Sequence, residues 1–192
     1  MKEELFYKEM ASMQSERLFK LIKKEAFIKQ KIILSSGKES DYYLDLRKIT
    51  LKGEGIYLIS HIFFSMIKDD VFSAIGGPTL GADPIISALS YLLFLEKKPI
   101  NTFIIRKAPK QHGTQRLIEG PFLEKDSKVI IVDDVVTTGK SLIESVAILK
   151  QEGVKVEKAL AVVDREEGTK EALESLGVEL KSIFLGSQFL DS

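Results

Sequence analysis

One stretch, residues 128–141, limits the possible fold more than any other part of the chain. It reads K-V-I-I-V-D-D-V-V-T-T-G-K-S. Its apolar residues 129–132 are continuous rather than alternating, which predicts a strand buried on both faces of a parallel sheet. The acids Asp133 and Asp134 end this run and open a loop, and an amphipathic helix is expected from Ser141. The stretch therefore predicts a strand, a loop and a helix of an α/β fold.

The loop has the composition of an anion-binding site. Thr137, Thr138 and Gly139 offer hydroxyl and main-chain N–H groups at a helix N-terminus, where an anion is favoured. Two carboxylates beside such a cradle would repel a bare phosphate, so the ligand should also bring hydroxyl groups or a divalent cation. A ribose 5-phosphate has both the phosphate and the hydroxyls. One alternative is a nucleotide-binding P-loop, whose first glycine would fall at Asp134. Another is an ordinary strand-to-helix turn whose acids face water.

The composition narrows the class of protein. With 192 residues and 44% hydrophobic content, the chain is expected to form a single domain spanning residues 1–192. Lysine plus arginine and aspartate plus glutamate number 28 each, so the chain has no net positive charge that would attract nucleic acid or an anionic membrane. The absence of cysteine excludes disulfides, a thiolate nucleophile and a zinc–thiolate site. With no signal peptide and no long apolar run, a soluble cytoplasmic protein without nucleic-acid or membrane partners is expected.

The spacing of apolar residues predicts the order of the elements. Helices are expected at 12–27 or 15–27, at 53–68, at 81–94 with an interruption at Pro84, from 141, and at 169–176. Strands are expected at 31–34 and 42–46, forming a hairpin-like flap, and at 72–75, 101–105, 129–132, 154–163 and 178–185. Strands and helices alternate from about residue 70, which predicts a doubly wound parallel sheet with ligand loops at the strand carboxyl ends. The core is expected at about 70–185, with about 1–50 forming an N-terminal helix and a small hood.

The stretch 128–141 resembles the phosphoribosyl pyrophosphate (PRPP) motif of type I phosphoribosyltransferases. The resemblance implies that Asp133 and Asp134 hold the ribose 2′ and 3′ hydroxyls and take part in catalysis. It also implies that the loop grips the 5-phosphate of PRPP. The implied PRPP contacts in this stretch are Asp133, Asp134, Val135, Val136, Thr137, Thr138, Gly139, Lys140 and Ser141.

A basic segment at residues 106–120, R-K-A-P-K-Q-H-G-T-Q-R-L-I-E-G, lacks a helical apolar period. A solvated basic loop is the simplest alternative. The segment resembles the R-K-x-x-K-x-H-G-x-x-x-x-I-E-G loop of orotate phosphoribosyltransferases, a mobile loop that closes over the active site of the neighbouring subunit. The resemblance implies a homodimer with shared active sites. It also implies PRPP contacts from Arg106, Lys107, Lys110 and His112, of which Lys107, Lys110 and His112 are candidate catalytic residues, and His112 is a candidate proton donor.

Two further sequence matches concern the residues that contact the nucleobase substrate in this family. The stretch around S-G-K-E-S-D-Y-Y is similar to the family's hood, which implies that Tyr43 forms a wall of the orotate pocket. The V-D-R sequence ending at Arg165 is similar to the element that binds the orotate carboxylate, and Thr137 is the third implied orotate contact. The alternatives are that one of Tyr42 and Tyr43 is core and the other surface, and that Arg165 forms a surface ion pair with Glu166 or Glu167.

The resemblance covers nearly the whole chain and implies synthesis of orotidine 5′-monophosphate and pyrophosphate from orotate and PRPP. Mg²⁺ is expected as a cofactor carried by PRPP, with no metal ligand from the protein. Some family members have a lysine where Ser35 stands, and Tyr-Lys where Leu80 and Gly81 stand, in the loop that meets the pyrophosphate. A purine-base phosphoribosyltransferase is one alternative, although it would lack the 106–120 segment and V-D-R. The other is a non-catalytic PRPP-sensing regulator, which would be expected to carry a basic nucleic-acid face.

Overall fold

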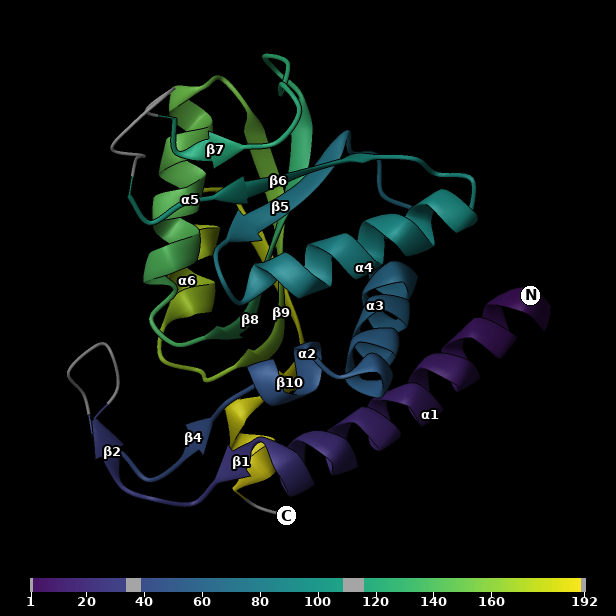
Figure 1. The fold of residues 1–192 in the computed structure, drawn as a ribbon, viewed down its shortest axis with the longest axis vertical. Coiled ribbons are helices and arrows are strands. Elements are labelled where there is room, and N and C mark those ends of the chain that lie inside the picture. Colours follow the sequence, from purple (N-terminus) through teal and green to yellow (C-terminus); the bar gives the residue numbers. More distant parts are fainter. Residues whose placement is uncertain (1, 34–38, 109–115, 191–192) are drawn as a thin grey trace.

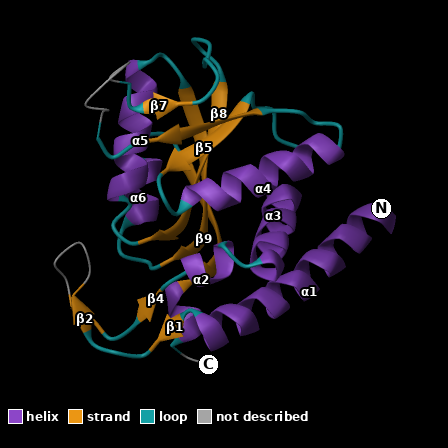
Figure 2. Ribbon diagram, viewed as in Figure 1, coloured by secondary structure: helices purple, strands orange, loops and turns teal. Residues whose placement is uncertain are grey.

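The computed structural model describes residues 2–33, 39–108 and 116–190, which form a central sheet with helices on both sides (Figures 1 and 2). The helices are α1 (Lys2–Glu25), α2 (Arg47–Thr50), α3 (Gly53–Ile67), α4 (Ala82–Leu95), α5 (Lys140–Gln151) and α6 (Thr169–Glu174), followed by a short 3-10 helix, η1 (Gly186–Phe189). The strands are β1 (Phe27–Ile28), β2 (Ile32–Ile33), β3 (Glu39–Ser40), β4 (Tyr43–Leu44), β5 (Ala74–Pro78), β6 (Asn101–Ile105), β7 (Ile118–Glu119), β8 (Lys128–Val136), β9 (Lys155–Asp164) and β10 (Glu179–Leu185).

The main sheet has the strand order β10-β9-β8-β5-β6-β7. All neighbouring pairs are parallel except β6 and β7, so the predicted doubly wound parallel sheet is confirmed, with one short antiparallel strand at an edge. The strand order reverses at β5, which pairs with β6 on one side and with β8 on the other. In sheets of this kind, ligands bind in the crevice outside the carboxyl ends of the strands at the reversal. The carboxyl ends of β5 and β8 are therefore the expected position of the site.

Burial of β8 on both faces explains its continuous apolar run. Ile130 and Val132 belong to a core cluster with residues of α1, α3 and α4, whereas Val129 and Ile131 belong to a second cluster with residues of α5 and α6. All four side chains are buried, and each contributes on the order of 1.5–3 kcal/mol by leaving water. Figure 1 shows α5 and α6 on one side of the sheet and α3 and α4 on the other.

Two strands extend well beyond their predicted bounds. β8 continues to Val136 because Asp133, Val135 and Val136 still pair with β9, so the two acids lie in the strand rather than in the loop. β5 runs from Ala74 to Pro78, later than the predicted 72–75, because residues 76–78 pair with residues 103–105 of β6. A Cβ atom at Gly76 would lie 2.3 Å from the Phe103 ring, so this close pairing requires glycine.

The first segment also differs from expectation, and the last forms a short helix for which the sequence made no prediction. Helix α1 begins at Lys2, well before Ser12, and its residues Leu18 and Ile22 join the core cluster that contains Ile130. The predicted flap consists of two nested antiparallel pairs of short strands, β1 with β4 and β2 with β3. The C-terminal η1 closes onto α1, where Phe189 stacks on Phe19 at 4.6 Å between ring centroids.

Helix α4 is not interrupted at Pro84, contrary to the sequence expectation, because this residue lies in the first helical turn, where a main-chain N–H has no intrahelical partner. None of the helices in the described part of the chain combines the length and the apolar character that a membrane crossing requires.

Candidate active site

The two acids predicted to bind a ligand lie at the carboxyl end of β8, beside the reversal of strand order. The Asp134 N–H donates to Asp133 Oδ1 at 2.9 Å, and the Val135 N–H donates to Asp134 Oδ1 at 2.8 Å. Burial raises the pKa of Asp133 well above its ordinary value, and the neighbouring Asp134 carboxylate adds to the rise. Burial also raises the pKa of Asp134. The pair is therefore costly to ionise until hydrogen-bond donors or cations approach it.

The loop that follows β5 covers the acid pair. The Thr79–Leu80 peptide bond in this loop is cis, and the Thr79 N–H donates to the carbonyl of Ile105. A Cβ atom at Gly81 would lie 2.3 Å from Asp134 Oδ1 and 2.7 Å from Asp133 Oδ1. The two carboxylates would have to move to admit a side chain here, and as glycine residue 81 offers the acids no cation.

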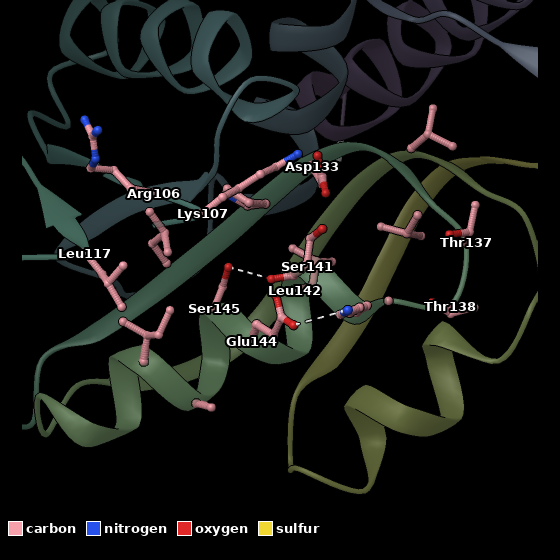
Figure 3. Close-up of a pocket in the computed structure, with 18 residues that line it drawn as sticks. Arg106, Lys107, Leu117, Asp133, Thr137, Thr138, Ser141, Leu142, Glu144 and Ser145 are labelled. Atoms are coloured by element: carbon pink, nitrogen blue, oxygen red, sulfur yellow. Dashed lines mark hydrogen bonds and ion pairs between the residues drawn. The ribbon is translucent and has the colours of Figure 1, made fainter. Parts of the chain in front are cut away.

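The predicted anion cradle is present directly after β8. Gly139 precedes α5 in the left-handed region (φ 72°), and a Cβ atom there would lie 2.7 Å from Thr169 Cγ2. As a glycine N-cap it has no side chain to accept from the first N–H groups of α5, which favour an anion. The cradle and Asp133 line a pocket of about 660 Å³ (Figure 3). Its wall is formed by Pro78, Ile105, Arg106, Lys107, Leu117, Asp133, Val135, Val136, Thr137, Thr138, Gly139, Lys140, Ser141, Leu142, Glu144, Ser145, Ala147 and Ile148.

Thr169, the first residue of α6, contacts the cradle and holds it in place. Its side chain is fully buried, and Oγ1 donates to the main-chain carbonyl of Thr137 at 2.6 Å. The methyl group of the same side chain lies where a Cβ atom of residue 139 would need room, 2.7 Å from that position. No motif marks this residue in the sequence, where its only signal is a threonine at a helix start after Gly168. It holds the loop in place without facing the pocket.

The cations of the basic segment differ in their orientation. Lys107 points toward Asp133 (Figure 3), and its positive charge opposes the rise in the pKa of that carboxyl. Arg106 lines the pocket, but its Nη1 pairs with Glu119 Oε1 at 3.7 Å. Lys140 is exposed and pairs with Glu144 at 3.9 Å. The candidate residues Lys110 and His112 lie outside the described residues.

Arg165 is buried rather than at the surface. It follows β9, its Nη2 donates to Ser40 Oγ at 2.6 Å, and its guanidinium carbon lies 4.2 Å from the centroid of the Tyr42 ring. Nε lies 3.3 Å from a Glu167 oxygen, an ion pair without the alignment of a hydrogen bond. The ion pair with Glu167 thus exists, but it is largely inside the protein. Arg165 ties the N-terminal strand β3 to the carboxyl end of β9.

Tyr42 and Tyr43 lie in different environments. Tyr42 is buried and stacks on Phe27 at 5.6 Å, and burial raises the pKa of its hydroxyl. Tyr43 is half-buried, and its hydroxyl accepts a hydrogen bond from Arg47 Nη2 at 3.4 Å. Of the two, Tyr43 has the more accessible side chain. Ser35, where some family members have a lysine, is outside the described residues.

The structure thus brings Asp133, the cradle, Arg106 and Lys107 to one pocket, while Asp134, Tyr43 and Arg165 are not part of its wall. Within residues 2–33, 39–108 and 116–190, no group of three or more His, Cys, Asp or Glu side chains has a metal-holding arrangement. The two carboxylates supply hard oxygen donors, which suit Mg²⁺ when substrate phosphates complete its coordination.

Comparisons with known proteins agree with this arrangement. The family described as "Phosphoribosyl transferase domain" matches residues 54–181. The orotate phosphoribosyltransferase of Aquifex aeolicus is 42% identical over 184 residues, which cover 94% of this chain and 100% of the relative. Crystal structures of Mycobacterium tuberculosis orotate phosphoribosyltransferase cover 92% of this chain and 98% of theirs. The complex with Fe(III) dicitrate has a TM-score of 0.79 at 35% identity, and the complex with PRPP has 0.74 at 32%.

Proposed function

The chain belongs to the phosphoribosyl transferase family, and from this premise we infer that it is an orotate phosphoribosyltransferase. It transfers the 5-phosphoribosyl group from PRPP to orotate and releases pyrophosphate, giving orotidine 5′-monophosphate for pyrimidine biosynthesis. The observation that carries this inference is the acid pair of β8 beside the cradle at the start of α5. Hydroxyl acceptors and an anion site at this spacing suit a phosphorylated ribose.

The proposed donor site uses the two halves of this unit. Ionised Asp133 and Asp134 accept hydrogen bonds from the ribose 2′ and 3′ hydroxyls, because a carboxylate is an acceptor only. Main-chain N–H groups and hydroxyls of residues 137–141 hold the 5-phosphate at the N-terminus of α5. Thr169 fixes the carbonyl of Thr137 and so keeps the cradle in shape.

The chemical step separates charge. Breaking the bond between ribose C1 and the pyrophosphate builds positive charge on the ring and negative charge on the leaving oxygens. Orotate is an anion with an acidic ring nitrogen, so no strong base is required. We propose that Lys107, Arg106, Lys110 and His112 stabilise the leaving group, which is most effective in a site closed to water. Mg²⁺, arriving with PRPP, would shield the phosphate charges.

The orotate contacts are also proposals. Arg165 is the candidate for the orotate carboxylate, with Tyr43 and Thr137 beside the ring. Because the Arg165 guanidinium is engaged by Ser40 and Glu167, an orotate carboxylate would have to replace at least one of these contacts. The cytoplasmic location expected from the sequence stays a prediction.

The reaction is tested by pyrophosphate release from PRPP and Mg²⁺ with orotate, adenine, hypoxanthine or uracil. We expect release when orotate is the base and no release with the other three bases. Release with a purine alone would identify a purine-base enzyme, and no release with any base would favour a PRPP-sensing regulator. Neither alternative is favoured by a specific feature of the site.

Replacing Thr169 by valine should loosen the cradle. The variant keeps the side-chain shape but loses the hydrogen bond to Thr137, which should lower the free energy of unfolding by about 1 kcal/mol. We expect the KM for PRPP to rise roughly 5- to 10-fold, with a smaller change in the KM for orotate. Urea denaturation and initial-rate kinetics measure both effects.

Thr50→Val is the matched control for this substitution. Thr50 is equally buried, but its hydroxyl has no hydrogen-bond partner among the described residues. Its replacement should leave both stability and kinetics unchanged or raise stability. Identical KM values for PRPP in Thr169→Val and the wild type would contradict the proposed role of Thr169.

We further propose a homodimer in which the part of the 106–120 loop beyond Lys107 acts on the neighbouring subunit. Lys107 faces Asp133 of its own chain, so the test uses Lys110. Asp133→Asn and Lys110→Ala should each be nearly inactive. If the loop is shared, co-refolded mixtures should regain up to about a quarter of wild-type activity, because each mixed dimer has one intact site. No recovery despite mixed dimers would show that Lys110 acts within its own chain.

A further inference from the structure

Arg165 begins at the same edge of the sheet as the pocket. Its main-chain N–H donates to the carbonyl of Val136 at 2.9 Å, and the preceding Asp164 pairs with Val136 in the register of β8 and β9. Val136 belongs to the pocket wall that also contains Asp133 and the cradle. In sheets of this kind, ligands bind outside the carboxyl ends of the strands. The main chain of Arg165 is therefore in direct contact with the wall of the proposed donor site.

The guanidinium of Arg165 is held from one side by residues of the N-terminal hood. Ser40 Oγ accepts from Nη2 at 2.6 Å and donates to the carbonyl of Tyr42 at 2.8 Å, so this hydroxyl acts as acceptor and donor at once. The Tyr42 ring centroid lies 4.2 Å from the guanidinium carbon. The same ring stacks on Phe27, which stacks on the buried Phe189 of η1. This side of the guanidinium is thus fixed to the core.

The contact of Arg165 with Glu167 is weaker than its contact with Ser40. Arg165 Nε lies 3.3 Å from Glu167 Oε1 without the alignment of a hydrogen bond, and this buried nitrogen has no hydrogen-bond partner among the described residues. A buried charged donor without a partner is costly. The Arg165 side chain is only 4% exposed, whereas the Glu167 side chain is 20% exposed and can turn toward water. The guanidinium therefore has an unused donor on the side that Glu167 can leave.

Resting on the proposed function, we propose that the carboxylate of orotate displaces Glu167 from Arg165, while Ser40 and Tyr42 keep their contacts with the guanidinium. The exchange replaces one carboxylate by another, so the buried positive charge stays compensated. A ligand carboxylate can also accept from Nε in good alignment, which Glu167 does not do. A base without a carboxylate cannot make this exchange, so Glu167 stays in place and the base gains nothing from Arg165. Glu167 is thus a placeholder that favours orotate over uncharged bases.

The test compares two nucleotides that differ only in this carboxylate, orotidine 5′-monophosphate and uridine 5′-monophosphate, by isothermal titration calorimetry. Both carry the 5-phosphate and the ribose hydroxyls, so the uridine nucleotide reports whether the donor site is intact. Glu167→Gln should tighten binding of the orotidine nucleotide by roughly 3- to 10-fold, because the internal competitor loses its charge. Ser40→Ala should weaken that binding by about 5- to 10-fold, because the guanidinium is no longer held in position. Binding of the uridine nucleotide should change by less than about threefold in both variants.

Glu166→Gln is the matched control, because it removes the same charge from the neighbouring residue. Glu166 Oε2 accepts from the Ser187 N–H at 3.0 Å, a contact that the amide oxygen of glutamine can keep. This variant should bind both nucleotides as the wild type does. Tighter binding of the orotidine nucleotide by Ser40→Ala would overturn the proposal, since the carboxylate would then displace Ser40. Equal changes for both nucleotides, or unchanged binding of the orotidine nucleotide in Glu167→Gln, would also overturn it. Failure of the proposed function is a separate result, seen when the wild type prefers the orotidine nucleotide but releases no pyrophosphate with orotate.

Discussion

Asp133→Asn is expected to produce a protein that is more stable than the wild type near neutral pH and almost inactive. The Asp133 carboxyl is buried and adjoins another carboxyl, and both features raise its pKa. Ionising it in the folded state therefore costs more than ionising it in the unfolded chain. An asparagine keeps the oxygen that accepts from the Asp134 N–H and removes the charge. The same change should lower kcat/KM for PRPP by about 100-fold, because the ribose hydroxyls lose a charged acceptor.

The pH dependence of stability gives a sharper test. Because the pKa of Asp133 is higher in the folded state, the folded protein binds more protons than the unfolded chain between the two pKa values. The wild type should therefore lose unfolding free energy as pH rises through this window. Asp133→Asn should lack this contribution, so its stability advantage should be near zero at acidic pH and grow as pH rises. Urea denaturation at several pH values between about 5 and 8 measures this difference.

Asp126→Asn is the control with the opposite sign. Asp126 is exposed, and its hydrogen bond to Lys155 lowers its pKa. Its backbone lies in the left-handed region (φ 62°), which asparagine tolerates. This variant should be no more stable than the wild type and fully active. A destabilised Asp133→Asn protein across the whole pH range would show that the carboxylate contributes to the fold, contrary to our interpretation.

The sequence was informative where a local pattern determined the structure. The continuous apolar run at 129–132 predicted burial on both faces, because no other strand environment tolerates it. Asp133, Thr137, Thr138 and Gly139 lie close together in the sequence, so their common pocket followed from the strand–loop–helix unit. The exact length of β8 did not follow, because pairing of Val135 and Val136 with β9 depends on a partner elsewhere in the chain.

Residues that act on the site from a distance in the sequence were not predictable in the same way. Thr169 reaches Thr137 across 32 positions, and its role depends on how α6 packs beneath the cradle. The close approach of Gly81 to the two carboxylates likewise joins segments that are far apart in the sequence. Such contacts arise from tertiary packing, which no local period or motif encodes.

Lys107→Ala is the second substitution with a large expected effect, and it should impair turnover more than PRPP binding. The Lys107 amine points toward Asp133 at the pocket, near the place where negative charge develops on the leaving group. A charge placed for the transition state lowers the barrier without a matching gain in ground-state affinity. We expect kcat to fall by about 100-fold or more, and the Kd for PRPP to rise by less than about tenfold.

The effect of Lys107 on Asp133 separates this role from a general loss of positive charge. Lys107 lowers the pKa of Asp133, although burial and Asp134 outweigh it. Without Lys107 that pKa should rise further, so the acidic limb of the kcat/KM profile should move to higher pH. Lys128→Ala removes a half-exposed lysine at the opposite end of β8, where it pairs with Glu157. This variant should change neither kcat nor the position of the acidic limb. Equal losses in kcat and PRPP affinity for Lys107→Ala, with an unshifted acidic limb, would mean that the lysine binds substrate and transition state alike.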